Sequence, residues 1–162
     1  MSIGYSPIAS SYNELYREEQ LAKVEAVLKH FKPDRRDLLL DLGCGTGLAS
    51  SGFKSRKVGL DNSMALLRLA PGLERVCGTA ERLPFKTKCF DVVICLTAIH
   101  NFQEFKAALG EMQRVSNRQV VSVLRRSEKY REISNTIREM LVIQHEIETE
   151  RDTIFITQVA TR

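Results

Sequence analysis

The segment LLLDLGCGTG, residues 38 to 47, constrains the fold of this chain more than any other part of the sequence. Its first five residues form a short apolar run typical of a strand buried on both faces, and the glycines that follow permit a sharp turn. Similar runs recur at KVGLD, ERVCG, FDVVICLTA and QVVSVL, separated by segments with helical patterns. Buried strands that alternate with helices predict crossover units and therefore a parallel sheet.

The two ends of the chain complete this prediction. Apolar residues at helical spacing, together with a capping pattern of Ser11 and Glu14, predict a helix from about Tyr12 to Phe31 that ends before Pro33. Near the C-terminus, KYREISNTIREML predicts a helix, and VIQHEIETE and TIFITQVA predict an antiparallel hairpin at the sheet edge. We therefore predict an α/β fold with a doubly wound, Rossmann-like sheet of seven strands, mostly parallel with an antiparallel C-terminal hairpin.

Composition limits the classes of protein to consider. A chain of 162 residues with 43% hydrophobic residues suits one core, and the longest strongly apolar stretch, VVICLTAI, is far shorter than the roughly 20 residues of a membrane span. Without a signal-like N-terminal run, we expect a soluble, intracellular, cytoplasmic protein. The four cysteines show no CxxC pair, so we predict reduced, mostly buried thiols and no metal site.

The glycines of the loop alone fit a structural turn, a dinucleotide loop or a phosphate cradle. No Lys-Ser/Thr pair follows them, which excludes a nucleoside triphosphate P-loop. Asp41, two residues before the first glycine, opposes a pyrophosphate and favours an ammonium or sulfonium group. Asp61, at the end of the next strand, can accept hydrogen bonds from both hydroxyls of a ribose. The loop GTAERLPF offers its backbone and Glu81 to an adenine edge. These residues favour a nucleoside that carries a cationic group.

Four blocks occur in the order DLGCGTG, VGLDNSMALL, GTAERLPF and FDVVICLTAIHNF. With them the chain resembles the class I S-adenosylmethionine-dependent methyltransferases from about Tyr12 to Leu124. Within that family it is most similar to the branch typified by ubiquinone/menaquinone-biosynthesis methyltransferases (methyltransferase type 11), which also holds tRNA and rRNA methyltransferases. The resemblance implies S-adenosylmethionine as cofactor and one domain over residues 1–162. That domain comprises a helical cap (1–33), a cofactor-binding core (37–126) and a terminal helix with the hairpin (127–162).

The resemblance also implies which residues contact the cofactor. They lie on the N-terminal helix, the glycine loop, the second strand and the loops after the third and fourth strands: Tyr12, Tyr16, Asp41, Gly43, Cys44, Gly45, Gly47, Asp61, Asn62, Ala80, Glu81 and Leu96. The chain departs from the family at Thr79, where an acidic residue often binds the adenine amine. After Gly47 there is room for only a short helix, and the block RVLKPGG survives only as RVSNRQ.

His100, in TAIHNF, is the candidate catalytic residue, as a base or as a hydrogen-bond partner of the methyl acceptor. The alternative is a loop histidine bonded to the backbone. Asn101 and Phe102 are candidate acceptor contacts, with loop packing as the alternative. The family's Asn/Asp-Pro-Pro-aromatic tetrad is absent here, which makes exocyclic base amines and glutamine amides less favoured acceptors. His30 and His145 are expected to be structural.

Basic residues follow the fifth strand at Arg125, Arg126, Lys129 and Arg131. They contact RNA phosphates or form an exposed helix start. Because the chain has almost no insertion that could enclose a small substrate, we favour RNA or a translation-related protein as acceptor, with a small activating protein subunit as a further partner. The alternatives are a small metabolite or quinone precursor as acceptor, a NAD-dependent oxidoreductase, and a non-catalytic cofactor-binding subunit.

Overall fold

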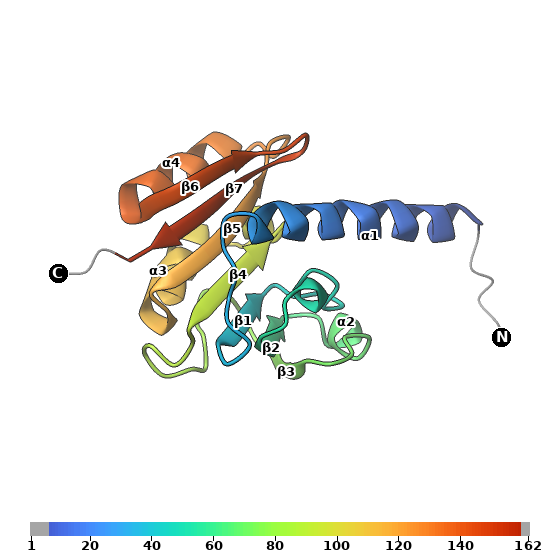
Figure 1. The fold of residues 1–162 in the computed structure, drawn as a ribbon, viewed down its shortest axis with the longest axis horizontal. Coiled ribbons are helices and arrows are strands. Elements are labelled where there is room, and N and C mark those ends of the chain that lie inside the picture. The colour runs from blue at the N-terminus through green and yellow to red at the C-terminus, as the bar shows by residue number, and fades with distance from the viewer. Residues whose placement is uncertain (1–6, 160–162) are drawn as a thin grey trace.

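The computed structural model describes residues 7–159, and their side chains from residue 14 onward. A seven-stranded sheet in the order β3-β2-β1-β4-β5-β7-β6 forms the centre of the molecule (Figure 1). The strands are β1 (Leu38–Leu42), β2 (Arg56–Asp61), β3 (Glu74–Cys77), β4 (Val92–Leu96), β5 (Arg118–Leu124), β6 (Val142–Glu148) and β7 (Asp152–Gln158). The helices are α1 (Pro7–Leu28), α2 (Met64–Leu67), α3 (Phe105–Val115) and α4 (Tyr130–Met140), with 3-10 turns η1 (Ser50–Gly52) and η2 (Ile99–Asn101).

The topology confirms the predicted fold class. Strands β1 to β5 pair in parallel, whereas β7 lies between β5 and β6 and runs antiparallel to both. The chain moves outward from β1 through β2 to β3 and then returns to place β4 on the other side of β1. At such a reversal the loops after the two central strands diverge, and the carboxyl ends of the strands form a ligand-binding crevice.

Alternate residues of the central strands pack on opposite faces of the sheet. Leu39 belongs to the apolar cluster beneath α1, with Val24 and Val27, whereas Leu40 belongs to the cluster beneath α3 and α4. The N-terminal half of α1 extends beyond the sheet (Figure 1), and Leu15 there is 67% exposed. Among the side chains of α1 that the structure describes, those in the core come from its C-terminal half.

The bounds of α1 differ from the predicted helix of Tyr12 to Phe31. The helix begins at Pro7, so Ser11 lies inside it and the predicted capping pair does not mark its start. Proline is favoured at the first helical position because its missing N–H needs no partner there. At the other end the helix stops at Leu28, and His30 lies in the turn that follows, with its ring 4.9 Å from that of His145.

The prediction of mostly buried cysteines holds for Cys44 and Cys95 and is wrong for Cys77 and Cys89, which are exposed. Cys77 lies on β3, an edge strand that is little covered, so an apolar run there did not imply burial. The described residues contain no cluster of three metal-ligating side chains, and none of their helices has the length and hydrophobicity of a membrane span.

Candidate functional site

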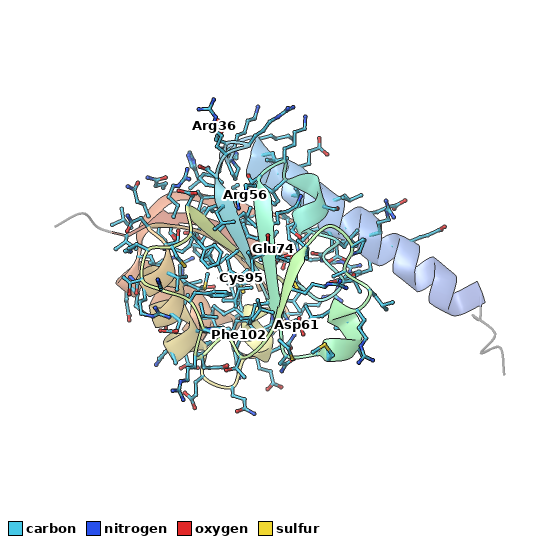
Figure 2. The ribbon with its side chains drawn as sticks, turned by 90° about the horizontal axis from the view of Figure 1, so that it is seen from below. Arg36, Arg56, Asp61, Glu74, Cys95 and Phe102 are labelled. Carbon is cyan, nitrogen blue, oxygen red and sulfur yellow. The ribbon has the colours of Figure 1, made fainter. Side chains whose placement is uncertain are left out.

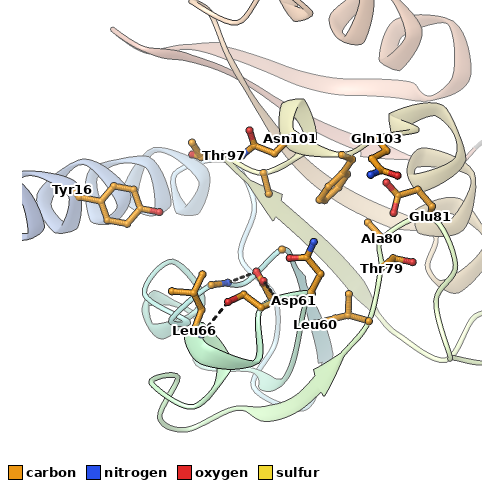
Figure 3. Close-up of a pocket in the computed structure, with 17 residues that line it drawn as sticks. Tyr16, Leu60, Asp61, Leu66, Thr79, Ala80, Glu81, Thr97, Asn101 and Gln103 are labelled. Atoms are coloured by element: carbon orange, nitrogen blue, oxygen red, sulfur yellow. Dashed lines mark hydrogen bonds between the residues drawn. The ribbon is translucent and has the colours of Figure 1, made fainter.

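A pocket of about 480 Å³ lies at the carboxyl ends of β1 to β4, where the sheet topology reverses (Figure 3). Its walls come from the four loops that follow these strands, from α2 and from α1. The structure brings together there most of the side chains proposed from sequence: Tyr16, Gly43, Gly45, Asp61, Asn62, Ala80, Glu81, Asn101 and Phe102. A pocket whose walls come from residues so far apart in sequence is the candidate binding site.

The glycine loop forms the floor of this pocket. Gly43 has a φ of +72°, its N–H donates to the Leu60 carbonyl at 2.8 Å, and a Cβ added to it would lie 2.6 Å from Cβ of Ala98. Gly45 has a φ of +55° and open space in front of it. The loop therefore needs glycine at Gly43 for both conformation and space, and at Gly45 for conformation and for access of a ligand to the backbone.

Asp61 organises the same loop. Its Oδ2 accepts the Gly45 N–H at 2.9 Å and its Oδ1 accepts the Ser63 N–H at 2.8 Å, so one carboxylate joins the glycine loop to the turn before α2 (Figure 3). The sequence predicted a ribose contact for Asp61 but did not predict this structural role. A carboxylate oxygen can accept more than one hydrogen bond, so Asp61 retains acceptor capacity toward the pocket.

Asp41 and Cys44 do not line the pocket but lie beneath the loop. Asp41 is 2% exposed, and its Oδ2 has no hydrogen-bond partner within the described part of the chain. Desolvation by burial raises the pKa of Asp41 to about 7, so a cation bound nearby would favour its ionised form. Burial also raises the pKa of the Cys44 thiol to about 12, which keeps that thiol protonated at neutral pH.

The other residues proposed for the cofactor have varied positions. Gly47 lines a second groove instead, and Leu96 is buried in β4 just before the pocket wall. Tyr16 lines both the pocket and the groove, and is 43% exposed. Tyr12 falls on the part of α1 whose side chains are not described.

Several residues of the pocket wall were not predicted from the sequence, including Leu60, Ser63, Leu66, Thr97, Ala98 and Gln103. Most of them adjoin a predicted residue: Ser63 follows Asn62, and Gln103 follows Phe102. Proximity to a motif was therefore the available signal, but it does not tell which neighbouring side chains face the ligand.

His100 lies on η2, next to Asn101, and does not line the pocket. Its Nδ1 is buried and has no hydrogen-bond partner in the described residues, so that nitrogen makes no backbone contact there. Burial lowers the pKa of His100, an effect that the negative charge of Asp152 opposes. A neutral imidazole at pH 7 is able to accept a proton.

The basic residues after β5 lie outside the pocket wall. The Arg125 guanidinium donates to the Thr149 carbonyl at 3.2 Å, and Lys129 Nζ donates to the Phe102 carbonyl at 3.4 Å. Arg126 and Arg131 are exposed. Lys129 thus connects these four basic residues, here called the basic rim, to the part of the pocket wall formed by Phe102.

The second groove has a volume of about 740 Å³ and separates the N-terminal half of α1 from α2 and the glycine loop. Its lining includes the apolar side chains of Leu48, Leu66, Leu69 and Pro71. Because Tyr16 and Leu66 belong to both walls, the groove and the pocket are neighbours.

Comparison with known proteins agrees with this geometry. A family model described as Methyltransferase domain matches residues 40–123, which span β1 to β5 and contain nearly all of the pocket. This chain belongs to the class I S-adenosylmethionine-dependent methyltransferases. The match includes the glycine loop, Asp61 and the segment from Thr97 to Phe102, so the family blocks quoted above coincide with the pocket wall.

The curated relatives of this chain carry different names. It is 30% identical over 118 residues to the uncharacterized methyltransferase YcgJ of Bacillus subtilis, a match that covers 63% of this chain and 47% of YcgJ. It is 38% identical over 88 residues to the phthiotriol/phenolphthiotriol dimycocerosates methyltransferase of Mycobacterium leprae, covering 48% of this chain and 33% of that protein. The chain thus spans less than half the length of these curated relatives.

A solved structure shares the fold over nearly the whole chain. It is the complex between the Haloferax volcanii Trm112 methyltransferase activator and a methyltransferase, with a TM-score of 0.75 and 16% identity, covering 95% of this chain and 94% of the matched one. At this identity the similarity establishes the fold alone.

Proposed function

We propose that this protein transfers the sulfonium methyl group of S-adenosylmethionine to an RNA acceptor, with the pocket at the carboxyl ends of β1 to β4 as the cofactor site. The observation that carries the cofactor assignment is the combination of Asp61, Gly43 and Gly45 in one pocket, next to the buried carboxyl of Asp41, whose Oδ2 has no partner among the described residues. Acidic groups near a glycine floor suit a ribose and a cationic amino-acid end, and they disfavour the pyrophosphate of NAD.

Each part of the pocket then has a task. Asp61 binds ribose hydroxyls, while Ala80 and Glu81, on the loop after β3, lie at the adenine end. Gly43 and Gly45 leave room for the methionine portion beside the end of β4. Bound S-adenosylmethionine supplies an already activated methyl group, so the protein mainly has to position the reactants and exclude water.

Asn101 and Phe102 are the acceptor contacts in this proposal, one polar and one able to stack on a base. His100, next to Asn101 but outside the pocket wall, serves as a proton sink if the acceptor extends toward η2. Its lowered pKa supports this role, because a base must be unprotonated before it accepts a proton.

The basic rim supports RNA as the acceptor. Arg125, Arg126, Lys129 and Arg131 follow β5, and Lys129 contacts the carbonyl of pocket residue Phe102. Phosphate contacts from this rim would guide a nucleic acid toward Asn101 and Phe102 and give a steep salt dependence.

A charge-reversal pair tests the RNA proposal. Arg125→Glu/Arg126→Glu should sharply reduce transfer of label from methyl-labelled S-adenosylmethionine to total cellular RNA. The matched control is Arg36→Glu/Arg56→Glu, which changes the same charge at the end of the molecule opposite Asp61 and Phe102 (Figure 2) and should leave labelling unchanged. Equal loss in both variants, or label only in protein or lipid, would contradict RNA as the acceptor.

A second candidate acceptor is a small molecule with an apolar portion, such as a quinone precursor. The observation that favours it is the largely apolar groove of about 740 Å³ that shares Tyr16 and Leu66 with the pocket wall. The lipid named for the mycobacterial relative is consistent with this class. Leu69→Asp, on the groove wall, should abolish labelling of a lipid extract and spare labelling of RNA.

We also propose a small activating protein as a partner. The support is the fold shared with a chain of the Trm112 complex, together with two exposed apolar residues, Leu15 on α1 and Leu69 on the groove wall. Co-expression with an activator of that type should raise the yield of soluble protein and form a complex of defined stoichiometry in size-exclusion chromatography. Two separate peaks would contradict this partner.

A further inference from the structure

A buried ion pair joins α1 to the start of β7. Lys23 Nζ lies 2.8 Å from Asp152 Oδ2, and the side chains are only 2% and 1% exposed. Oδ1 of Asp152 receives no hydrogen bond from the residues that the structure describes. Desolvating two charges is costly, and an incompletely bonded pair offsets that cost poorly, so stability alone does not account for Lys23 and Asp152.

The ammonium of this pair has a second partner. Lys23 Nζ donates a hydrogen bond to Oγ1 of Thr97, and Nε2 of Gln20 lies 3.4 Å from the same oxygen. The Thr97 N–H donates in turn to Oγ of Ser122 at 2.7 Å. Thr97 is therefore held by side chains of α1 and β5, while its lysine partner is held by β7.

The backbone of Thr97 is strained. Its φ is +59°, a left-handed conformation that a β-branched residue adopts at a cost of about 1–3 kcal/mol. Such strain persists only where surrounding contacts enforce it, and it concentrates at binding and catalytic sites. Thr97 directly follows β4 and belongs to the pocket wall (Figure 3).

The hydroxyl of Thr97 can bind a ligand only as a hydrogen-bond donor. Its Oγ1 already accepts from two nitrogen donors, so its hydrogen alone is left for a further hydrogen bond. The contact with an ammonium makes that hydrogen a stronger donor. Thr97 is therefore suited to donate to an anionic oxygen.

The charges of the pocket wall indicate which anionic oxygen of the ligand would receive this hydrogen bond. Among the described residues that line the pocket, the charged side chains are Asp61 and Glu81, both acidic. The methionine portion of the cofactor carries a carboxylate, which requires a donor in such surroundings. Buried Lys23 contacts the Thr97 hydroxyl, and exposed Lys129 contacts the Phe102 carbonyl. A carbonyl has no hydrogen to donate, whereas the Thr97 hydroxyl presents the charge of Lys23 through its own hydrogen.

We propose that Thr97 donates its hydroxyl hydrogen to the methionine carboxylate of the cofactor, and that Lys23 and Asp152 are positioning residues that hold and polarise it. This inference rests on the proposed cofactor site. It assigns the strained turn after β4 to recognition of the amino-acid end of the cofactor, and it makes the docking of α1 on the sheet a condition for that recognition.

Two ligands and two variants test it. S-adenosylhomocysteine carries the carboxylate, whereas 5′-methylthioadenosine keeps the nucleoside and lacks the amino-acid part. In calorimetric titrations, Thr97→Val should weaken S-adenosylhomocysteine about tenfold to a hundredfold, as for loss of a hydrogen bond to a charged group, and leave 5′-methylthioadenosine unchanged. Thr97→Ser, which keeps the hydroxyl, should bind both ligands like the wild type.

The positioning role has its own variant. Lys23→Met/Asp152→Asn removes both charges without leaving one unpaired, and it should weaken S-adenosylhomocysteine selectively. Adding Thr97→Val to it should then cost less than in the wild type, because the two changes act on one contact. Thermal melting checks that each variant is folded, and Thr97→Ala replaces Thr97→Val if that variant does not fold.

Three results would overturn the inference: wild-type affinity in the variant without the hydroxyl, equal loss of both ligands, or additive effects of the two sets of changes. Failure of the wild-type protein to bind either ligand would instead refute the proposed cofactor site.

Discussion

The replacement of Asp61 by Asn tests the carboxylate that holds the glycine loop and that we propose binds the ribose of the ligand. The wild-type carboxylate accepts backbone N–H groups from Gly45 and Ser63, at 2.9 and 2.8 Å. An amide offers one oxygen, so one of these N–H groups would face an NH₂ group. The backbone hydrogen bond is present without ligand, so its loss lowers the stability of the protein. The affinity depends on the ribose contact, and a hydrogen bond to a charged group contributes about 1.5–3 kcal/mol. We therefore expect S-adenosylhomocysteine affinity to fall about tenfold to a hundredfold.

The assay is calorimetric titration with S-adenosylhomocysteine, combined with thermal melting of the protein without ligand. Asp91→Asn is the matched control, because Asp91 Oδ2 also accepts a backbone N–H, that of Leu38 at 2.7 Å, at the other end of the sheet. Both variants should lose some thermal stability, but only Asp61→Asn should lose affinity. An Asp61→Asn protein that binds within about threefold of the wild type would refute the role assigned to this carboxylate.

Four further predictions concern residues in and around the pocket. Burial raises the pKa of Asp41 to about 7, and the α-ammonium of bound S-adenosylhomocysteine would favour the ionised form. The calorimetric affinity for this ligand should therefore be about tenfold weaker at pH 6 than at pH 8, and Asp41→Asn should remove this pH dependence. The same shift should lower the stability of the ligand-free protein as pH rises from about 4 to 7, since the folded state holds this proton more tightly, and urea melts at several pH values measure it. His100→Ala should slow methyl transfer and leave calorimetric affinity intact; full turnover would make His100 structural. Gly43→Ala should lower the melting temperature more than Gly72→Ala, because both glycines have φ near +72° but only Gly43 meets another atom, Cβ of Ala98 at 2.6 Å.

The parallel part of the fold could be read from the sequence because its strands are short continuous apolar runs. LLLDL coincides with β1, and QVVSVL lies within β5. The start of α1 could not be read as well, because Pro7 at a first helical position and Ser11 as a cap are both acceptable local signals. Local patterns therefore gave the strands more reliably than the helix ends.

The site divides in the same way. Asp61, Gly43 and Gly45 lie in continuous motifs, and the sequence placed them in the pocket wall. Asp41 also lies in such a motif, but the sequence does not show that its side chain is buried and lies outside the pocket wall. The contact of Lys23 with Thr97 spans 74 residues and depends on how α1 packs across the sheet. No local pattern encodes that contact, so it becomes visible only in the folded molecule.

Calorimetric titration of the wild-type protein with S-adenosylhomocysteine and, separately, with NAD tests the central claim most directly. The acidic pocket with its glycine floor predicts saturable binding of one S-adenosylhomocysteine per chain and no measurable heat with NAD. Saturable binding of NAD, without a response to S-adenosylhomocysteine, would contradict the assignment of this pocket to the methyl donor.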